Sequence, residues 1–218
     1  MHTGAGRSFR RAPRQERSRS TVDAIFEAAA RVVDEAGVEA ATTGRIAHVA
    51  GVSIGSLYQY FPRKEALFGA LTERVMEADL ERVREAVDRA RDEPLEAGAR
   101  AVLRAGFQFI LQRPRVFCWM VRYLPELVLL PSVERWERSL IGEIRRFLGD
   151  HEAELAGVDL DLHAMICVGA ARGSLLLVAR ERPEVLEQAD VALDLAMDTW
   201  LGMLKAQRER LQNPSAAP

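Results

Sequence analysis

Cysteine is scarce in this sequence, which contains only Cys118 and Cys167 among its 218 residues. The two lie far apart in apolar surroundings, and neither belongs to a CxxC motif or has a pair of histidines nearby. A disulfide-stabilised scaffold and a cysteine-ligated zinc site therefore have no support in the sequence. We interpret both cysteines as residues of a hydrophobic core.

Long apolar runs are also missing, because charged residues interrupt them before they reach the ~20 residues of a membrane span. The arginines near the N-terminus are followed by more arginines rather than by an apolar segment, so no signal peptide is recognised. Hydrophobic residues make up 48% of the chain and charged residues 28%, as in ordinary soluble proteins. We expect a cytoplasmic protein without a membrane partner.

Several motifs of common enzyme classes are absent, including the HExxH pattern of zinc proteases, the P-loop and the dinucleotide-binding fingerprint. His163 stands close to Asp159 and Asp161, which invites a metal-binding interpretation, but acidic residues just before a helix are usually caps. We therefore predict no metal, no cofactor and no catalytic residue. A helical enzyme or carrier is kept as a remote alternative.

Alternation of apolar and polar residues with period two, the pattern of β-strands, does not extend over any useful length. Apolar residues recur instead at intervals of three and four, which predicts an all-α fold. Proline and glycine mark the expected helix ends, because proline inside a helix costs about 3 kcal/mol. We expect about nine helices, at residues 18–36, 43–50, 54–60, 64–91, 95–112, 115–124, 132–149, 160–181 and 184–208.

Positive charge is concentrated at the N-terminus, although the net charge of the chain is only −2. Residues 1–68 contain ten Lys/Arg and seven Asp/Glu, a net charge of +3, and the remainder contains 20 and 25, a net charge of −5. The first residues form a basic cluster with glycine, proline and little apolar periodicity: Arg7, Arg10, Arg11, Arg14, Arg17 and Arg19. We predict a flexible basic arm at 1–17, either a solvated tail or a segment that contacts nucleic-acid phosphates.

The segment from Thr42 to Lys64 has the pattern of two short helices joined by a tight turn. A hydroxyl at Thr42 or Thr43 can cap the first of them, Gly51 ends it, and Ser53 can cap the second. Small residues allow the two helices to cross closely, and apolar residues form a miniature core with the preceding helix: Ala47, Ala50, Gly51, Ile46, Val49, Val52 and Leu57. The remaining side chains are free to face outward.

This segment is similar to the DNA-binding region of the tetracycline-repressor (TetR) family. Three parts of it carry the resemblance: TTGRIAHVAGVS at residues 42–53, GSLYQYF at 55–61 and KEAL at 64–67. Arg63 departs from the polar cap that the family has before its fourth helix. The resemblance implies a helix-turn-helix DNA-binding domain, which we place at 18–66, a helical ligand-binding and dimerisation domain at 67–210, and a tail at 211–218.

Candidate DNA contacts follow from the position of the recognition helix. The resemblance implies that Thr43, Tyr60 and Lys64 hold phosphates and that Tyr58 and Gln59 lie near bases or backbone. Gln59 has the groups to bond adenine, and Ile54 suits a thymine methyl. The alternative for the two tyrosines is an aromatic pair at the edge of the core. The full predicted DNA-binding set is Thr43, Arg45, Ser53, Ile54, Gly55, Ser56, Tyr58, Gln59, Tyr60 and Lys64.

The last two predicted helices have the composition of a dimer interface. Glycines at 169 and 173 permit close helix approach, and the final helix is apolar beyond a single stripe. The family builds a dimer from two such helices, whereas the alternative is an ordinary core within one chain. The predicted interface residues are Met165, Gly169, Gly173, Leu176, Leu193, Met197, Trp200 and Leu204.

Aromatic residues gather between positions 105 and 138, where they suit either a pocket for a hydrophobic ligand or a plain core. The predicted ligand-binding residues are Phe107, Phe109, Phe117, Trp119, Met120, Tyr123 and Trp136. The leading hypothesis is thus a homodimeric repressor that a small hydrophobic ligand releases from a palindromic double-stranded DNA operator. A dimeric DNA-binding regulator without small-molecule control is the alternative.

Overall fold

The computed structural model describes residues 16–37, 40–123 and 131–212, and every regular element in these ranges is helical. The prediction of an all-α fold is confirmed. Most of the predicted basic arm and tail lie outside the described residues. Glu16 and Arg17 begin the first helix instead of ending the arm, and the last helix runs to Gln212.

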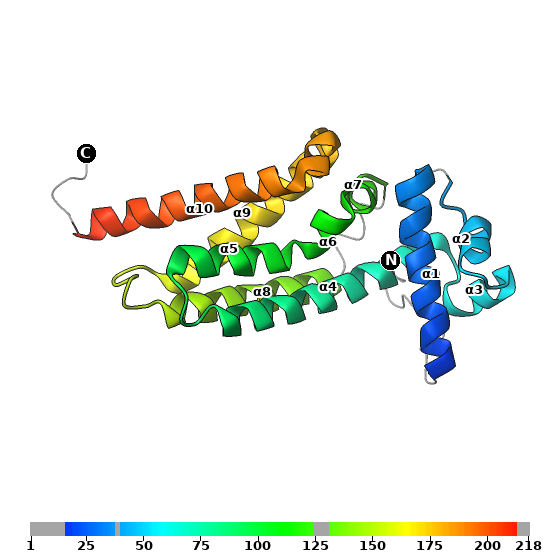
Figure 1. Cartoon of the computed structure of the whole chain (residues 1–218), viewed down its shortest axis with the longest axis horizontal. Coiled ribbons are helices and arrows are strands. Elements are labelled where there is room, and N and C mark those ends of the chain that lie inside the picture. Colours follow the sequence, from blue (N-terminus) through cyan, green and yellow to red (C-terminus); the bar gives the residue numbers. More distant parts are fainter. Residues whose placement is uncertain (1–15, 38–39, 124–130, 213–218) are drawn as a thin grey trace, which may run out of the picture.

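A compact group of helices forms one end of the molecule (Figure 1). It consists of α1 (Glu16–Ala36), α2 (Thr43–Val49) and α3 (Ile54–Tyr60). The long helix α4 (Lys64–Arg89) leaves this group and extends into the rest of the chain. Its N-terminal and C-terminal halves therefore belong to different parts of the fold.

The remaining helices pack along α4 as an elongated body. Helices α5 (Leu95–Gly106) and α8 (Pro131–Asp150) lie beside α4, and α9 (Leu160–Glu181) and α10 (Ala189–Gln212) lie on the far side of them (Figure 1). The short helices α6 (Gln108–Gln112) and α7 (Pro114–Tyr123) connect the body to α1. A 3₁₀ segment, Pro183–Gln188, joins α9 to α10.

Two of the predicted helices are each divided into two segments in the structure. The helix expected at 95–112 is broken at Phe107, whose N–H donates to Leu103 O and Arg104 O at 3.2 and 3.3 Å, where an unbroken helix has one i→i−4 bond. The helix expected from 184 begins with the 3₁₀ segment, so the described residues contain more than nine helices. Pro114 and Pro131 stand at first helical positions, where the missing N–H of proline has no cost.

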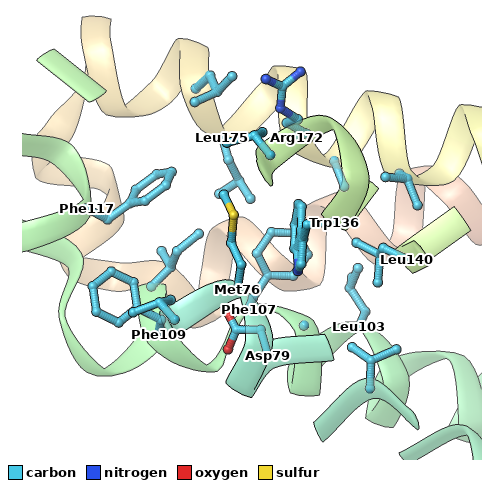
Figure 2. Close-up of a pocket in the computed structure, with 18 of the residues that line it drawn as sticks. Met76, Asp79, Leu103, Phe107, Phe109, Phe117, Trp136, Leu140, Arg172 and Leu175 are labelled. Atoms are coloured by element: carbon cyan, nitrogen blue, oxygen red, sulfur yellow. The ribbon is translucent and has the colours of Figure 1, made fainter. Parts of the chain in front are cut away.

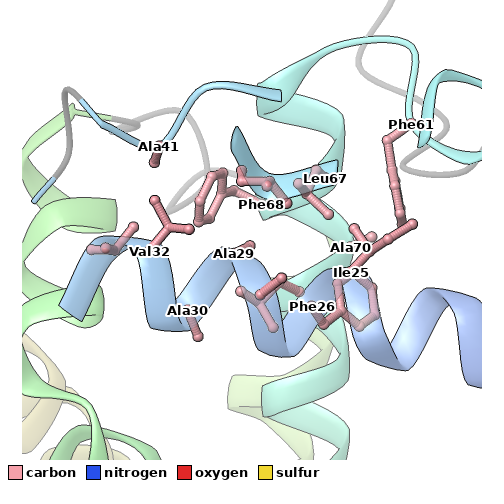
Figure 3. Close-up of a cluster of buried hydrophobic side chains, with 14 of the residues drawn as sticks. Ile25, Phe26, Ala29, Ala30, Val32, Ala41, Phe61, Leu67, Phe68 and Ala70 are labelled. Carbon is pink, nitrogen blue, oxygen red and sulfur yellow. The ribbon is translucent and has the colours of Figure 1, made fainter. Parts of the chain in front are cut away.

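Two hydrophobic cores share α4. The first joins α1, α2, α3, the start of α4 and part of α7 (Figure 3), and the second joins the end of α4 with α5, α8, α9 and α10. Leu67 and Phe68 are fully buried against α1, on the far side of the boundary predicted at 66. The first core therefore extends beyond residue 66 into α4.

Candidate DNA-binding and ligand-binding sites

The turn between α2 and α3 has the geometry that the sequence predicts. Thr42 is the cap of α2, and its Oγ1 accepts from Arg45 N at 3.2 Å. Gly51 ends the turn after α2 with φ +68°, a conformation that only glycine adopts without strain. Ser53 then caps α3, because its Oγ accepts from Ser56 N at 3.0 Å. These contacts fix the angle between the two helices.

The small core beneath the turn is also as predicted. Ile46 and Leu57 are fully buried, Ala47 nearly so, and Val49 and Val52 pack against them in part. Phe61 closes the core against Phe26 of α1, with ring centroids 5.6 Å apart. The helix α4 starts at Lys64 after Arg63, whose side chain makes no capping bond. The departure at Arg63 therefore leaves the start of α4 in place.

The predicted DNA-binding residues lie on the outer side of this unit. Six of them are exposed: Arg45, Ser53, Ile54, Gly55, Tyr58 and Gln59. The other four are half-buried: Thr43, Ser56, Tyr60 and Lys64. The hydroxyl of Tyr58 lies 3.1 Å from Thr43 Oγ1, so α2 and α3 present these two groups together.

The two tyrosines have different surroundings. Tyr58 is 41% exposed, which is against a role at the edge of the core. Tyr60 packs partly against the core, and its hydroxyl lies 2.9 Å from Ser18 Oγ of α1. Tyr60 thus joins the recognition helix to α1 and keeps a partly accessible ring.

Trp119 is a correction to the predicted ligand site. It is 3% exposed in the first core, where its ring meets Phe68 edge-on with centroids 4.2 Å apart. Lys64 Nζ stands 5.2 Å from the centroid of the same ring. Trp119 therefore supports the start of α4 and does not line the cavity described next. Sequence spacing could not reveal this, because Trp119 and Met120 are neighbours that both pack in the first core, and only Met120 also lines the cavity.

A cavity of about 170 Å³ lies among α4, α5, α6, α7, α8 and α9 (Figure 2). Five of the predicted ligand-binding residues line it: Phe107, Phe109, Phe117, Met120 and Trp136. The side chain of Tyr123 lies outside the described part of the structure. Most of the wall is aliphatic or aromatic, including Met76, Leu103, Leu140 and Leu175. Binding there is thus favoured for molecules with an apolar body.

Polar groups on the cavity wall are few, and the sequence analysis did not single them out. Thr72 donates its hydroxyl to Phe68 O at 2.9 Å, and Arg172 pairs with Glu137 at 2.6 Å. Asp79 forms an ion pair with Arg82, one turn further along α4. A signal was present for Asp79, because Val75 and Val83 stand four residues to either side and place it on an apolar helix face.

Burial dominates the electrostatics of Asp79. The residue is 6% exposed, and desolvation raises the pKa of its carboxyl from 3.8 to about 6. The hydrogen bond and charge of Arg82 act in the opposite direction but do not cancel the desolvation. An ionised Asp79 carboxylate in the wall of this apolar cavity therefore lowers the stability of the folded state.

The predicted dimer residues fall into two sets. Met165, Gly169 and Gly173 on α9 are exposed, and Leu176 is half-buried at the cavity wall. The four α10 residues are instead at most 7% exposed within the chain's own core: Leu193, Met197, Trp200 and Leu204. Since these four face inward, they do not form a surface for a partner. The apolar residues of α10 that do face outward are Val191, Leu195 and Met203.

Helix α9 exposes an unusual amount of apolar surface. Leu162, Ile166 and Leu177 are 43–54% exposed beside Met165. Among the described helices, α9 alone is long and apolar enough to cross a membrane, by length and composition only. In the structure, 28% of its most apolar stretch is buried. A Cβ atom placed at Gly169, Gly173 or Gly202 would meet nothing within 4 Å in the chain. Among the residues that the structure describes, none fills the space beside these glycines.

Comparison with known sequences follows the division of the fold. The family of bacterial regulatory proteins of the tetR type matches residues 25–71, and the tetracyclin repressor-like C-terminal domain matches residues 94–198. The chain belongs to the TetR family. It is thus a transcriptional regulator with a DNA-binding helix-turn-helix, as the resemblance of residues 42–67 implied.

Curated relatives match only part of the chain. The nucleoid occlusion factor SlmA of Haemophilus ducreyi is 51% identical over 41 residues, which are 19% of this chain and 20% of that protein. SlmA of Glaesserella parasuis is 38% identical over 82 residues, 38% of this chain and 39% of that protein. The chain therefore spans less than half the length of these relatives.

Solved TetR-like structures resemble the whole fold. SmeT, the repressor of the Stenotrophomonas maltophilia multidrug efflux pump SmeDEF, has a TM-score of 0.60 at 22% identity, covering 86% of this chain and 91% of its own. FadR of Bacillus subtilis in complex with stearoyl-CoA has a TM-score of 0.59 at 18% identity, covering 84% and 96%. At such identities the likeness shows the shared fold.

Two other patterns in this TetR-family chain have structural explanations. Residues 51–55 spell GxSxG, but the nucleophile elbow with that spacing needs a strand before its serine, and here helices stand on both sides. Asp159 caps α9 by accepting from Leu162 N at 3.0 Å, as expected. His163 Nδ1 lies 3.0 Å from Asp159 O, a local contact within the first turn.

Proposed function

We propose that this TetR-family regulator is a homodimeric repressor that binds a palindromic operator and leaves it when a small molecule occupies the cavity. The observation that carries the proposal is the continuity of α4. Its first residue, Lys64, belongs to the predicted DNA surface, and its middle residues Met76 and Asp79 line the cavity. One rigid element therefore joins the two sites.

Helix α7 provides a second connection. Val116, Trp119 and Met120 pack in the first core, and Phe117 and Met120 line the cavity. Just before α7, Arg113 forms ion pairs with Glu27 and with Asp34 of α1, the latter at 2.8 Å. A ligand that displaces α7 would move α1 and the start of α4 together. Release from DNA requires only that the ligand prefer one of two such arrangements.

The apolar face of α9 and the outer residues of α10 support a homodimer. A large exposed apolar patch on a soluble chain is unfavourable unless a partner covers it, and the glycines there allow close helix contact. Two-fold pairing would also present two recognition helices, which reading of successive major grooves requires at a spacing of about 34–36 Å.

The fold neighbours support control by a small molecule. Two of them, both named FadR, were solved with acyl-CoA: that of Bacillus subtilis with stearoyl-CoA and that of Thermus thermophilus with lauroyl-CoA. In this chain the apolar cavity occupies the same kind of helical domain. A cytoplasmic location is consistent with a DNA-binding role.

Selection of bound sequences from random DNA duplexes tests the proposal. We expect enrichment of one inverted repeat, and an affinity that falls steeply with salt because Lys64 and the N-terminal arginines displace counterions. An operator found this way can then be used to test release by candidate ligands. Absence of any enriched repeat at moderate salt would overturn the repressor proposal.

Replacing Lys64 by alanine should lower affinity for all DNA sequences alike, by about tenfold, and should reduce the dependence on salt. Tyr60→Phe should act in the same uniform direction, since a phosphate contact carries no sequence information. Gln59→Ala should instead relax the preference at particular base pairs. Binding measured at several salt concentrations, on the operator and on scrambled duplexes, separates these effects.

The control for Lys64 is Lys205→Ala, which removes the only other lysine of the chain from an exposed position on α10. It should leave operator affinity unchanged. Equal losses in both lysine variants would show that general charge, rather than the start of α4, determines binding.

A further inference from the structure

The charge distribution around the cavity points to a class of ligand. Of the lining residues, Asp79 is the one carboxylate among those that the structure describes. Its ion pair with Arg82 uses Oδ1, and the side chain of Arg82 is 39% exposed and is not part of the cavity wall. The second oxygen, Oδ2, keeps its capacity to accept a hydrogen bond. Figure 2 shows the carboxylate of Asp79 on α4, below Met76 and Phe107 in this view.

The positive charge of the wall is already balanced. Arg172 lies at the opposite side of the cavity in Figure 2, and its guanidinium pairs with Glu137 at 2.6 Å. A ligand carboxylate would have to compete with Glu137 for Arg172. An anionic headgroup placed near α4 would instead meet the charge of Asp79. Neither end of the cavity therefore favours an anion.

The aromatic rings of the cavity wall also favour a positively charged ligand. Phe107, Phe109, Phe117 and Trp136 all line the cavity, on α6, α7 and α8 and at the break before α6. The face of an aromatic ring attracts a cation, most strongly where water is excluded. A carboxylate and several rings facing one apolar space thus select a positively charged group on an apolar body.

We propose, building on the cavity as the effector site of the proposed repressor, that its ligand is an apolar or aromatic amine whose protonated nitrogen bonds the carboxylate of Asp79. The hydrocarbon part fills the space between the aromatic rings. The ammonium group donates to Oδ2 of Asp79, whereas Arg82 pairs with Oδ1. The affinity gained by this pairing offsets the cost of keeping a carboxylate in an apolar wall.

The raised pKa of the Asp79 carboxyl agrees with this assignment. Burial holds the pKa of its carboxyl at about 6, so the group is ionised at neutral pH but is under-stabilised. The nearby charged groups are Arg82 on the same helix and the Arg172–Glu137 pair across the cavity. A bound cation would lower that pKa again, and amine binding should therefore weaken as the pH falls below about 6.

The test uses phenylbutylamine, phenylbutanol and phenylbutyrate, three probes that share one apolar body. Calorimetric titration of the full-length protein at about pH 7.5 should show the amine binding at least about tenfold more tightly than the other two, as a charge-assisted hydrogen bond predicts. Asp79→Asn should lower amine affinity by about tenfold and leave phenylbutanol within about threefold. Glu85→Gln, which removes an exposed carboxylate from the same helix, should change nothing.

Several outcomes would overturn the assignment. Equal binding of the alcohol or the carboxylate, an unchanged amine affinity in Asp79→Asn, or no binding of any probe would each contradict it. Operator selection with the wild-type protein, carried out without probe, tests the repressor function separately. If the amine binds through Asp79 but no operator exists, the proposed repressor function fails and the ligand assignment stands.

Discussion

Replacing Gly173 by arginine should turn the proposed dimer into monomers. It should lower affinity for the proposed palindromic operator by on the order of a thousandfold, since one half-site would remain bound where two were linked. The side chain would enter the exposed apolar face of α9 beside Met165 and Leu177. Within one chain, the new Cβ meets nothing within 4 Å, and arginine favours a helix more than glycine does. The protomer itself should therefore stay folded.

Sedimentation and operator binding, measured on the same preparations, check this result. Gly142→Arg is the matched control, because Gly142 also lies in a long helix with nothing within 4 Å of its Cβ position, but on α8. This control should remain dimeric and bind DNA normally. A dimeric Gly173→Arg variant with wild-type affinity would place the interface on another surface.

The DNA-binding end could be predicted closely because its determinants are local. The caps at Thr42 and Ser53 and the turn glycine at 51 act within a few residues, so the sequence itself shows them. The apolar spacing of Ile46 and Leu57 then identifies the buried side of each short helix. For the same reason the start of α4 could be predicted, even without a capping side chain at Arg63.

The faces of α10 could not be predicted, because apolar residues surround much of that helix. Which side packs inward depends on α5 and α9, which lie far away in the sequence. The structure turns Leu193, Met197 and Trp200 into the core and leaves Leu195 and Met203 outside. Composition alone predicted that the large apolar residues of α10 form the dimer interface. In the structure they pack in the core of the protomer.

The aromatic cluster shows the same limit. A density of rings at 107–136 suited either a pocket or a plain core, and the direction of each ring depends on tertiary packing. Trp119 and Met120 both belong to the first core, where Trp119 meets Phe68, but only Met120 also lines the cavity. Asp79 was not singled out, although Val75 and Val83 place it on an apolar helix face, because several other acidic residues stand on the same helix.

Asp79→Asn should make the protein more stable at neutral pH. In the folded state the pKa of Asp79 is raised from 3.8 to about 6, so folding opposes ionisation of this group. Below about pH 3.8 both states are protonated, and between this value and about 6 only the folded state keeps the proton. The stabilising contribution of the protonated carboxyl is therefore lost as the pH rises through this range. Asparagine does not ionise, and its amide oxygen still accepts a bond from Arg82.

The free energy of unfolding at about pH 7.5 should accordingly be higher in Asp79→Asn by about 2–3 kcal/mol, and the difference should fall toward zero near pH 4. Urea unfolding at fixed protein concentration across this pH range measures it, with Glu85→Gln as a control that should match wild type throughout. A less stable Asp79→Asn at neutral pH would mean that the ion pair with Arg82 outweighs the desolvation of Asp79. A more stable one would show that the chain retains a carboxylate in the cavity wall at the expense of its own stability, as expected of a group kept for binding rather than for folding.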